Sequence, residues 1–178
     1  MSCTVFNVVV MVVCAALLGG CGVTQTVTDA TVSTAKAIFY KQVKTLHLDL
    51  SARVALNTDT KEMSALSVPT LVRVYQLRDK KAVEKATYDL LVSDDDDKLG
   101  SELLGTQAVV VKPGEGVQLN VPLQEQAQFV AVVALFRTTD AQTNTWRVIL
   151  TRDELDPDQP RVIELGDNRL TLRPLAKD

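Results

Sequence analysis

The sequence predicts an all-β protein, namely a two-sheet antiparallel β-sandwich with one or two inserted short helices. Three observations support this prediction. Between residues 46 and 172, about eight short segments are apolar or alternate between apolar and polar residues, as strands do. Clusters of Gly, Pro, Asn and Asp separate most of those segments. Only one stretch among them, after residue 79, has the spacing of an amphipathic helix.

An uncharged apolar run precedes the strands. Residues 8–18 have about the length of a signal-peptide core and are too short to span a bilayer comfortably as a helix. They end in Leu18, Gly19, Gly20 and Cys21, which matches a lipobox, in which small residues admit the chain to the protease and the thiol receives a diacylglyceryl group. We therefore expect residues 1–20 to be a lipoprotein signal peptide and Cys21 to be lipidated. The pattern departs from a typical signal peptide because residues 1–7 contain no Lys or Arg.

The chain after Cys21 is predicted to tether a domain to a membrane. Gly22 follows the Cys, and an Asp at that place favours inner-membrane retention in diderm bacteria, so Gly22 indicates the outer membrane. Residues 22–33 are rich in Thr, Val and small polar residues, and residues 34–43 have apolar residues near helical spacing. We expect residues 21–45 to comprise the lipidated Cys, a tether and a short helix, followed by the β-sandwich domain over residues 46–178.

The first two strands have the clearest patterns. Alternation predicts a strand over residues 46–56, and Pro69 opens a second one over residues 70–77. The residues between them lack alternation and are rich in turn formers, which predicts a long loop. Met63 and Leu66 are apolar residues in that loop, and they either fold back to plug it or are displayed to a partner.

The remaining elements follow in a regular order. Asp79 is placed to cap a helix from Lys80 to about Val92, and residues 98–104 add a further helical turn. Six more strands are predicted at residues 107–111, 117–121, 129–138, 145–150, 161–165 and 169–172. Residues 129–136 are almost continuously apolar, so this strand is expected to be buried on both faces.

The composition offers little material for catalysis. His47 is the only His and lies on the polar phase of the first strand, and the sequence has no nucleophile, zinc-protease or Walker motif. Lys and Arg number 19 against 22 Asp and Glu and are scattered, so no nucleic-acid footprint is present. The run from Asp94 to Asp97 lacks the alternate spacing of calcium loops and is interpreted as a solvated acidic loop. We expect no enzymatic activity, no metal site and no cofactor.

The ordered set of motifs resembles a known family. The strand Pro69-Thr-Leu-Val-Arg-Val-Tyr-Gln-Leu77, the lipobox, Val130-Ala-Val-Val-Ala-Leu-Phe-Arg137 and Trp146 are similar to those of the TssJ (SciN) lipoproteins of type VI secretion systems. This resemblance implies a transthyretin-like sandwich and an outer-membrane lipoprotein that binds the periplasmic C-terminal domain of TssM, and through it TssL. It also implies that the loop between the first two strands is the partner-binding site. That loop consists of Asn57, Thr58, Asp59, Thr60, Lys61, Glu62, Met63, Ser64, Ala65, Leu66, Ser67 and Val68.

One alternative function remains open at the level of sequence. A lipoprotein domain of this kind could instead bind a glycan or another envelope polymer. Aromatic residues make up only 4% of the chain, which argues against a groove of stacking platforms. The adaptor function is therefore preferred.

Overall fold

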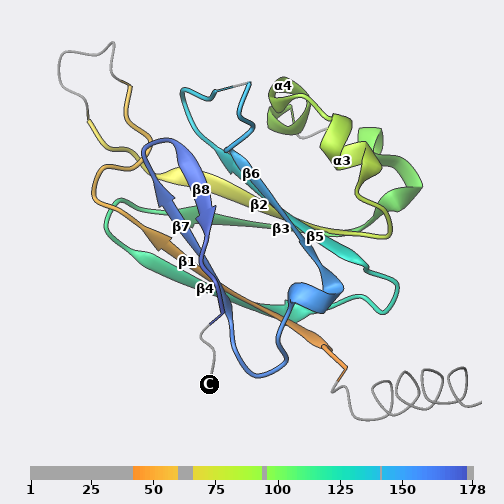
Figure 1. The fold of residues 1–178 in the computed structure, drawn as a ribbon. Coiled ribbons are helices and arrows are strands. Elements are labelled where there is room, and N and C mark those ends of the chain that lie inside the picture. Colours follow the sequence, from red (N-terminus) through yellow and green to blue (C-terminus); the bar gives the residue numbers. More distant parts are fainter. Residues whose placement is uncertain (1–41, 60–65, 94–95, 141, 176–178) are drawn as a thin grey trace, which may run out of the picture. The chain divides into compact units, whose positions relative to one another are not determined.

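The computed structural model consists of two packed four-stranded β-sheets (Figure 1). It describes residues 42–59, 66–93, 96–140 and 142–175. The strand order is β4-β1-β7-β8 in one sheet and β3-β2-β5-β6 in the other. The strands are β1 (Thr45–Ala52), β2 (Thr70–Leu77), β3 (Leu103–Val111), β4 (Gly116–Pro122), β5 (Phe129–Leu135), β6 (Arg147–Thr151), β7 (Arg161–Gly166) and β8 (Arg169–Leu172). The predicted β-sandwich is confirmed.

Antiparallel pairing dominates both sheets. Among the described strands, β1 pairs antiparallel with β4 on one side and parallel with β7 on the other. The pairs within the second sheet, and the β7–β8 hairpin, are antiparallel. The single parallel pair is a detail that the sequence pattern did not indicate, since strands of either direction alternate in the same way.

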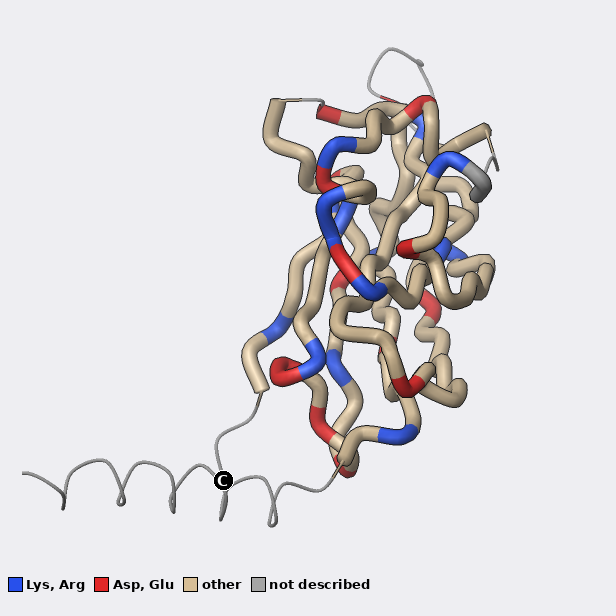
Figure 2. The backbone as a smooth tube through the Cα atoms, turned by 90° about the vertical axis from the view of Figure 1, so that its right-hand side faces the viewer, with Lys and Arg blue, Asp and Glu red and all other residues tan. Residues whose placement is uncertain are grey.

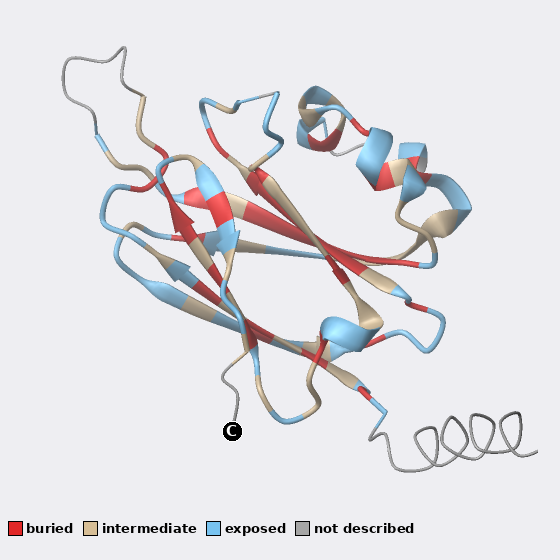
Figure 3. Ribbon diagram, viewed as in Figure 1, coloured by how far each residue is buried: buried red, intermediate tan, exposed pale blue. Residues whose placement is uncertain are grey.

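The core lies between the sheets, and part of the second sheet is also covered on its outer face. In β1 the inward residues Leu46, Leu48 and Leu50 are each at most 1% exposed, and they alternate with polar residues that face out. Each such Leu stabilises the fold by roughly 1.5–3 kcal/mol. In β5, residues 130–134 are all buried, which confirms the predicted strand buried on both faces (Figure 3).

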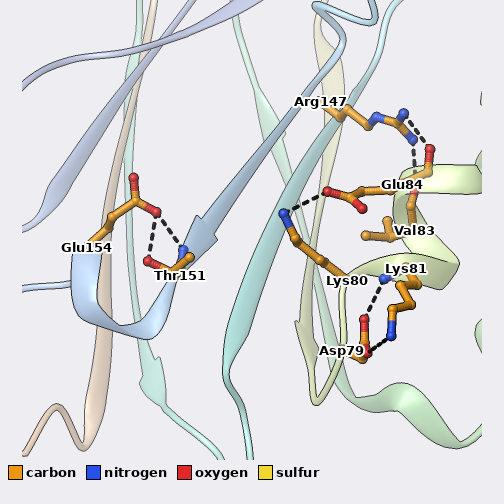
Figure 4. Close-up of polar contacts among 8 residues, drawn as sticks. All are labelled: Asp79, Lys80, Lys81, Val83, Glu84, Arg147, Thr151 and Glu154. Carbon is orange, nitrogen blue, oxygen red and sulfur yellow. Dashed lines mark hydrogen bonds and ion pairs between the residues drawn. The ribbon is translucent and has the colours of Figure 1, made fainter.

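The outer face of β5 is covered by a helical insertion, which is made of α3 (Lys81–Lys85), α4 (Tyr88–Val92) and the 3-10 segment η1 (Asp96–Glu102). The prediction of one continuous helix from Lys80 to Val92 was wrong, because Ala86 adopts an extended backbone and Thr87 starts a new helix. The Thr87 hydroxyl accepts the Leu90 N–H at 3.4 Å. Asp79 accepts the Lys81 N–H at 2.8 Å, ahead of α3 (Figure 4).

Arginine side chains fix this insertion to the sheet. Arg147 donates to the carbonyl oxygens of Val83 at 2.5 Å and Glu84 at 2.7 Å, where α3 leaves its carbonyls unpaired (Figure 4). Its guanidinium also lies over the Trp146 ring, 4.9 Å from the ring centre. Burial lowers the pKa of Arg147, and the charge of Glu84 opposes that shift. Arg73 in β2, 6% exposed, donates to the Leu91 carbonyl at 2.5 Å.

Several predicted boundaries were wrong by a few residues. β1 ends at Ala52 instead of residue 56, because the chain bends at residues 54 and 55, where the Leu56 N–H donates to the Val54 carbonyl at 3.0 Å. β5 ends at Leu135 instead of residue 138. The predicted helical turn at residues 98–104 is the 3-10 segment η1, and β3 begins directly after it at Leu103 instead of residue 107. The predicted tether, the helix at 34–43, Asp94 and Asp95 lie outside the described residues. Positive and negative residues are interleaved along the described backbone (Figure 2).

Candidate partner-binding site

The predicted partner-binding residues lie in the segment between β1 and β2. Residues 53–59 and 66–69 of this segment are described, and together they form the base of what we call the β1–β2 loop. Of the predicted residues, the structure therefore places Asn57, Thr58, Asp59, Leu66, Ser67 and Val68. The other six, namely Thr60, Lys61, Glu62, Met63, Ser64 and Ala65, lie outside the described residues.

Asn57 holds the base of the loop together. Its side chain is 3% exposed, its Nδ2 donates to the Pro69 carbonyl at 3.3 Å, and its Oδ1 accepts the Arg137 backbone N–H at 2.6 Å. Its φ of 50° lies in the left-handed region, which Asn tolerates better than most residues with a side chain. One buried amide thus joins the start of the loop, its end and the segment after β5.

Leu56 and Val68 close the loop beside Asn57. Leu56 is fully buried, and its carbonyl accepts the Val68 N–H at 3.2 Å. The chain therefore leaves and re-enters the sandwich at nearly the same point, as it does in an Ω-loop. Because Leu56 is buried in the core, the point where the chain leaves the sandwich is fixed relative to both sheets.

The turn between β7 and β8 supports the same base. Asp167 and Asn168 have φ values of 51° and 55°, the conformation of a two-residue hairpin turn. Asn168 Nδ2 donates to the Thr58 carbonyl at 2.7 Å, and the Asp167 N–H reaches the Ala55 carbonyl at 3.4 Å. These supports were not predicted, because the sequence marked residues 166–168 as a turn without indicating which segment they would meet.

Two exposed apolar side chains lie at this end of the domain. Leu66 is 61% exposed, and Val54, just after β1, is 78% exposed. Of the two alternatives raised by the sequence, Leu66 is displayed and does not plug the loop. Exposed apolar side chains on a fixed base are suited to protein docking, where partner contact removes them from water.

Charged groups of both signs lie near Val54. Arg53, the residue before Val54, lies 3.8 Å from Glu164 and 3.7 Å from Asp167. The Glu164 side chain is 19% exposed, whereas those of Arg53 and Asp167 are 62% and 58% exposed, so the Arg53–Asp167 pair contributes little to stability. A hydrogen bond from Arg173 holds the pKa of Glu164 below its usual value. Charges of both signs beside an exposed apolar side chain are typical of the polar rim of protein interfaces.

The segment between β5 and β6 is ordered by Asp140. Its carboxylate accepts the backbone N–H groups of Gln142 at 2.8 Å and Thr143 at 3.4 Å, and the Gln142 bond is the main cause of its lowered pKa. Asp140 is thus used as a turn former. A shallow hollow next to it is lined by Thr138, Thr139, Thr143, Thr145, Asp167, Asn168 and Arg169.

The described residues show no cluster of metal-ligating side chains. No three His, Cys, Asp or Glu side chains within them are grouped to hold a metal ion. His47 Nδ1 lies 2.6 Å from Asn120 Oδ1, so its ring takes part in a cross-strand contact between β1 and β4. No helix in this part of the chain is long and apolar enough to cross a membrane. Cys21 lies outside the described residues.

The fold is a two-sheet β-sandwich in which the described base of the β1–β2 loop displays the exposed Leu66. The comparisons name its family. The family model for type VI secretion lipoproteins, described as T6SS-SciN with VasD, EvfM and TssJ, matches residues 44–168. This match spans more than half of the chain, and the chain belongs to that family of type VI secretion lipoproteins.

Solved structures agree with this assignment. A chain in the structure "T6SS protein TssM C-terminal domain (869-1107) from EAEC" is 40% identical with a TM-score of 0.68, over 75% of this chain and 100% of that one. A chain of a "Type VI membrane complex" is 42% identical with a TM-score of 0.70 and the same coverage. The lipoprotein TssJ1 from Pseudomonas aeruginosa is 25% identical over 75% of this chain and 98% of that one, with a TM-score of 0.59. A search of curated protein sequences returned no match.

Proposed function

We propose that acyl chains on Cys21 hold this lipoprotein at the periplasmic face of the outer membrane while its β1–β2 loop docks on the periplasmic domain of TssM. TssM in turn connects the chain to TssL and to the inner membrane. The protein is then a structural adaptor that anchors the type VI secretion membrane complex and performs no chemistry of its own.

The observation that carries this proposal is the exposed Leu66 in a loop whose base is fixed by Asn57. A loop with a fixed base loses little conformational entropy when it binds, so more of its contact energy appears as affinity. Leu66 supplies apolar area for the centre of an interface, and the mixed charges of Arg53 and Glu164 supply a polar rim.

The similar structures from type VI secretion systems support TssM as the partner. The match covers 75% of the 178 residues of this chain and all of the matched chain in the TssM structure. The matched chain therefore has about 134 residues. The TssM domain for which that structure is named, residues 869–1107, is far longer, so we take the matched chain to be a companion of that domain. A relative at 40% identity beside TssM makes the same pairing the simplest proposal here.

The membrane anchor explains why one modest interface suffices. Two or three acyl chains bury many methylene groups at about 0.8 kcal/mol each, which makes anchoring stable. A tethered domain then meets its partner at a high effective concentration in the narrow space between the membranes.

The binding site is tested by measuring the affinity of the mature chain for the periplasmic domain of TssM. Leu66→Asp should weaken binding by about tenfold or more, because it places a charge at the centre of the interface. The matched control is Val92→Asp, which also replaces an exposed apolar residue but lies on α4, in the helical insertion. The control should bind like the parent.

Melting temperatures separate binding from folding in this test. Both substitutions are at exposed positions and should change stability by less than about 0.5 kcal/mol. Equal affinities for the parent and Leu66→Asp would remove the β1–β2 loop as the docking site. An equal loss in both variants would point to a general effect of added charge.

A further inference from the structure

Arg169 differs from the other arginines of this chain. Each of the other eight takes part in a hydrogen bond, an ion pair or another electrostatic contact. Within the part of the chain that the structure describes, the guanidinium of Arg169 has no such contact, and the residue is exposed. A guanidinium carries several N–H donors in a fixed planar arrangement. Arg169 therefore holds a set of donors that the domain itself does not use.

Arg169 lies beside the proposed docking site. It is the first residue of β8 and follows the turn of Asp167 and Asn168, at the same end of the domain as the β1–β2 loop (Figure 1). Asn168 Nδ2 donates to the Thr58 carbonyl at 2.7 Å. The Asp167 N–H donates to the Ala55 carbonyl at 3.4 Å. Because these bonds fix the turn to the base of the loop, Arg169 keeps its place relative to that base.

The hollow that Arg169 borders is held in shape by the domain. Arg169 lines it together with Thr143 and Thr145, which belong to the segment between β5 and β6. The Leu170 N–H donates to the Thr145 carbonyl at 2.7 Å, which joins β8 to that segment. Asp140 orders the same segment through its bonds to backbone N–H groups. A partner side chain would thus meet a preformed site, which costs less conformational entropy than a site that binding must first order.

The carboxylates around Arg169 have other partners. Asp140 and Asp167 line the same hollow, and Glu164 lines a second hollow that Arg169 also borders. Asp140 accepts two backbone N–H groups of its own segment. Asp167 and Glu164 both pair with Arg53, at 3.7 Å and 3.8 Å. The donors of Arg169 therefore remain for an acceptor that comes from outside the domain.

We propose that Arg169 is a specificity-determining residue of the docking surface and binds a carboxylate side chain of the periplasmic domain of TssM. The Arg169 contact rests on the proposed function and adds a charged anchor to the apolar contact of Leu66. The docking surface then extends from the β1–β2 loop across the β7–β8 turn to the hollow.

A carboxylate suits this position for a physical reason. The planar fork of a guanidinium matches the two oxygens of a carboxylate, so the pair forms two parallel charge-assisted hydrogen bonds. An interface removes water from both groups, and a guanidinium left there without an acceptor would oppose binding. Arginine is accordingly frequent among the interface residues whose replacement weakens binding most.

The affinity of the mature chain, residues 21–178, for the periplasmic domain of TssM tests this contact. Arg169→Gln should weaken binding by about tenfold. It should also flatten the dependence of Kd on salt concentration, because the lost contact joins opposite charges. Arg169→Lys keeps the charge without the planar fork, so its Kd should lie between those of the parent and Arg169→Gln. A merely structural role of Arg169 would change Kd without changing its salt dependence.

Arg173→Gln is the matched control. Arg173 lies just after β8, its side chain is 58% exposed, and it already bonds Glu164 within the domain. Its replacement removes the same charge from the same strand but takes away a guanidinium that the domain itself uses. Both Kd and its salt dependence should therefore stay within about twofold of the parent. Melting temperatures show whether each variant is folded.

An unchanged Kd and salt dependence for Arg169→Gln would overturn the Arg169 contact, and so would an equal loss of affinity in Arg173→Gln. Leu66→Asp judges the docking loop separately. A loss in Leu66→Asp alone would keep the loop and remove Arg169 from the docking surface. A loss in Arg169→Gln alone would keep the Arg169 contact and remove the loop. Failure of the parent to bind TssM would overturn both.

Discussion

The Oδ1 atom of Asn57 accepts the backbone N–H of Arg137 at 2.6 Å, across 80 positions of the sequence. The same amide donates to Pro69, at the other end of the β1–β2 loop. The described base of the loop is in this way held by the segment after β5. The proposed docking surface therefore depends on a buried side chain that need not touch the partner.

Replacing Asn57 by Ala should destabilise the domain by about 2–3 kcal/mol, since two partners lose a buried hydrogen bond and Ala is strained at positive φ. Asn57→Gly loses the same bonds but accepts that φ, so it should be about 1 kcal/mol more stable than Asn57→Ala. Unfolding in urea measures both differences. Equal free energies of unfolding for the two variants would show that the φ of 50° imposes no strain.

Tyr88 should make the domain sensitive to alkaline pH. Burial raises its pKa to about 12 from an ordinary value of 10, and its hydroxyl donates to the Phe136 carbonyl. The neutral form is favoured in the folded state, so its stabilisation is complete below pH 10 and is lost as the pH rises toward 12. Tyr88→Phe, which keeps the ring beside Trp146, should flatten the decline in unfolding free energy over that range. An unchanged decline would contradict this prediction.

Glu164 should contribute to acid sensitivity. The hydrogen bond from Arg173 is the main cause of its lowered pKa, and its ordinary value is 4.5. The carboxylate is favoured in the folded state, so its contribution is present above pH 4.5 and is lost as the pH falls through the lower folded value. Glu164→Gln should lose less stability than the parent between pH 6 and pH 3 in chemical denaturation. A parallel pair of curves would show that Glu164 is not involved.

Cys21→Ser should leave an unprocessed precursor that does not incorporate labelled palmitate, because the hydroxyl cannot take the place of the thiol in acylation. The measurement is metabolic labelling followed by membrane fractionation. Replacement of Cys14, which lies inside the predicted signal peptide, is the matched control and should label normally. Normal labelling of Cys21→Ser would remove the lipidation site.

Alternation and turn residues were sufficient to predict the eight strands, because each side chain's face depends only on local position. The break at Ala86 was missed since residues 80–92 have one apolar face, and the helix is divided by the docking of Arg147 onto the α3 carbonyls. The segment between β1 and β2 was predicted as a loop from its composition, and its role as a binding site rests on the family resemblance and stays a prediction. Its support by Arg137 and Asn168 was not foreseen, because contacts that distant in sequence leave no local pattern.

The β1–β2 loop is proposed to contact TssM in the cell. A photo-crosslinking residue in place of Leu66 tests this directly, with the same residue in place of Glu125, exposed at the opposite end of the sandwich, as the control. Leu66 should yield a crosslinked product that contains TssM, and Glu125 should not. Absence of the TssM product at Leu66, in cells that assemble the membrane complex, would show that the loop does not contact TssM.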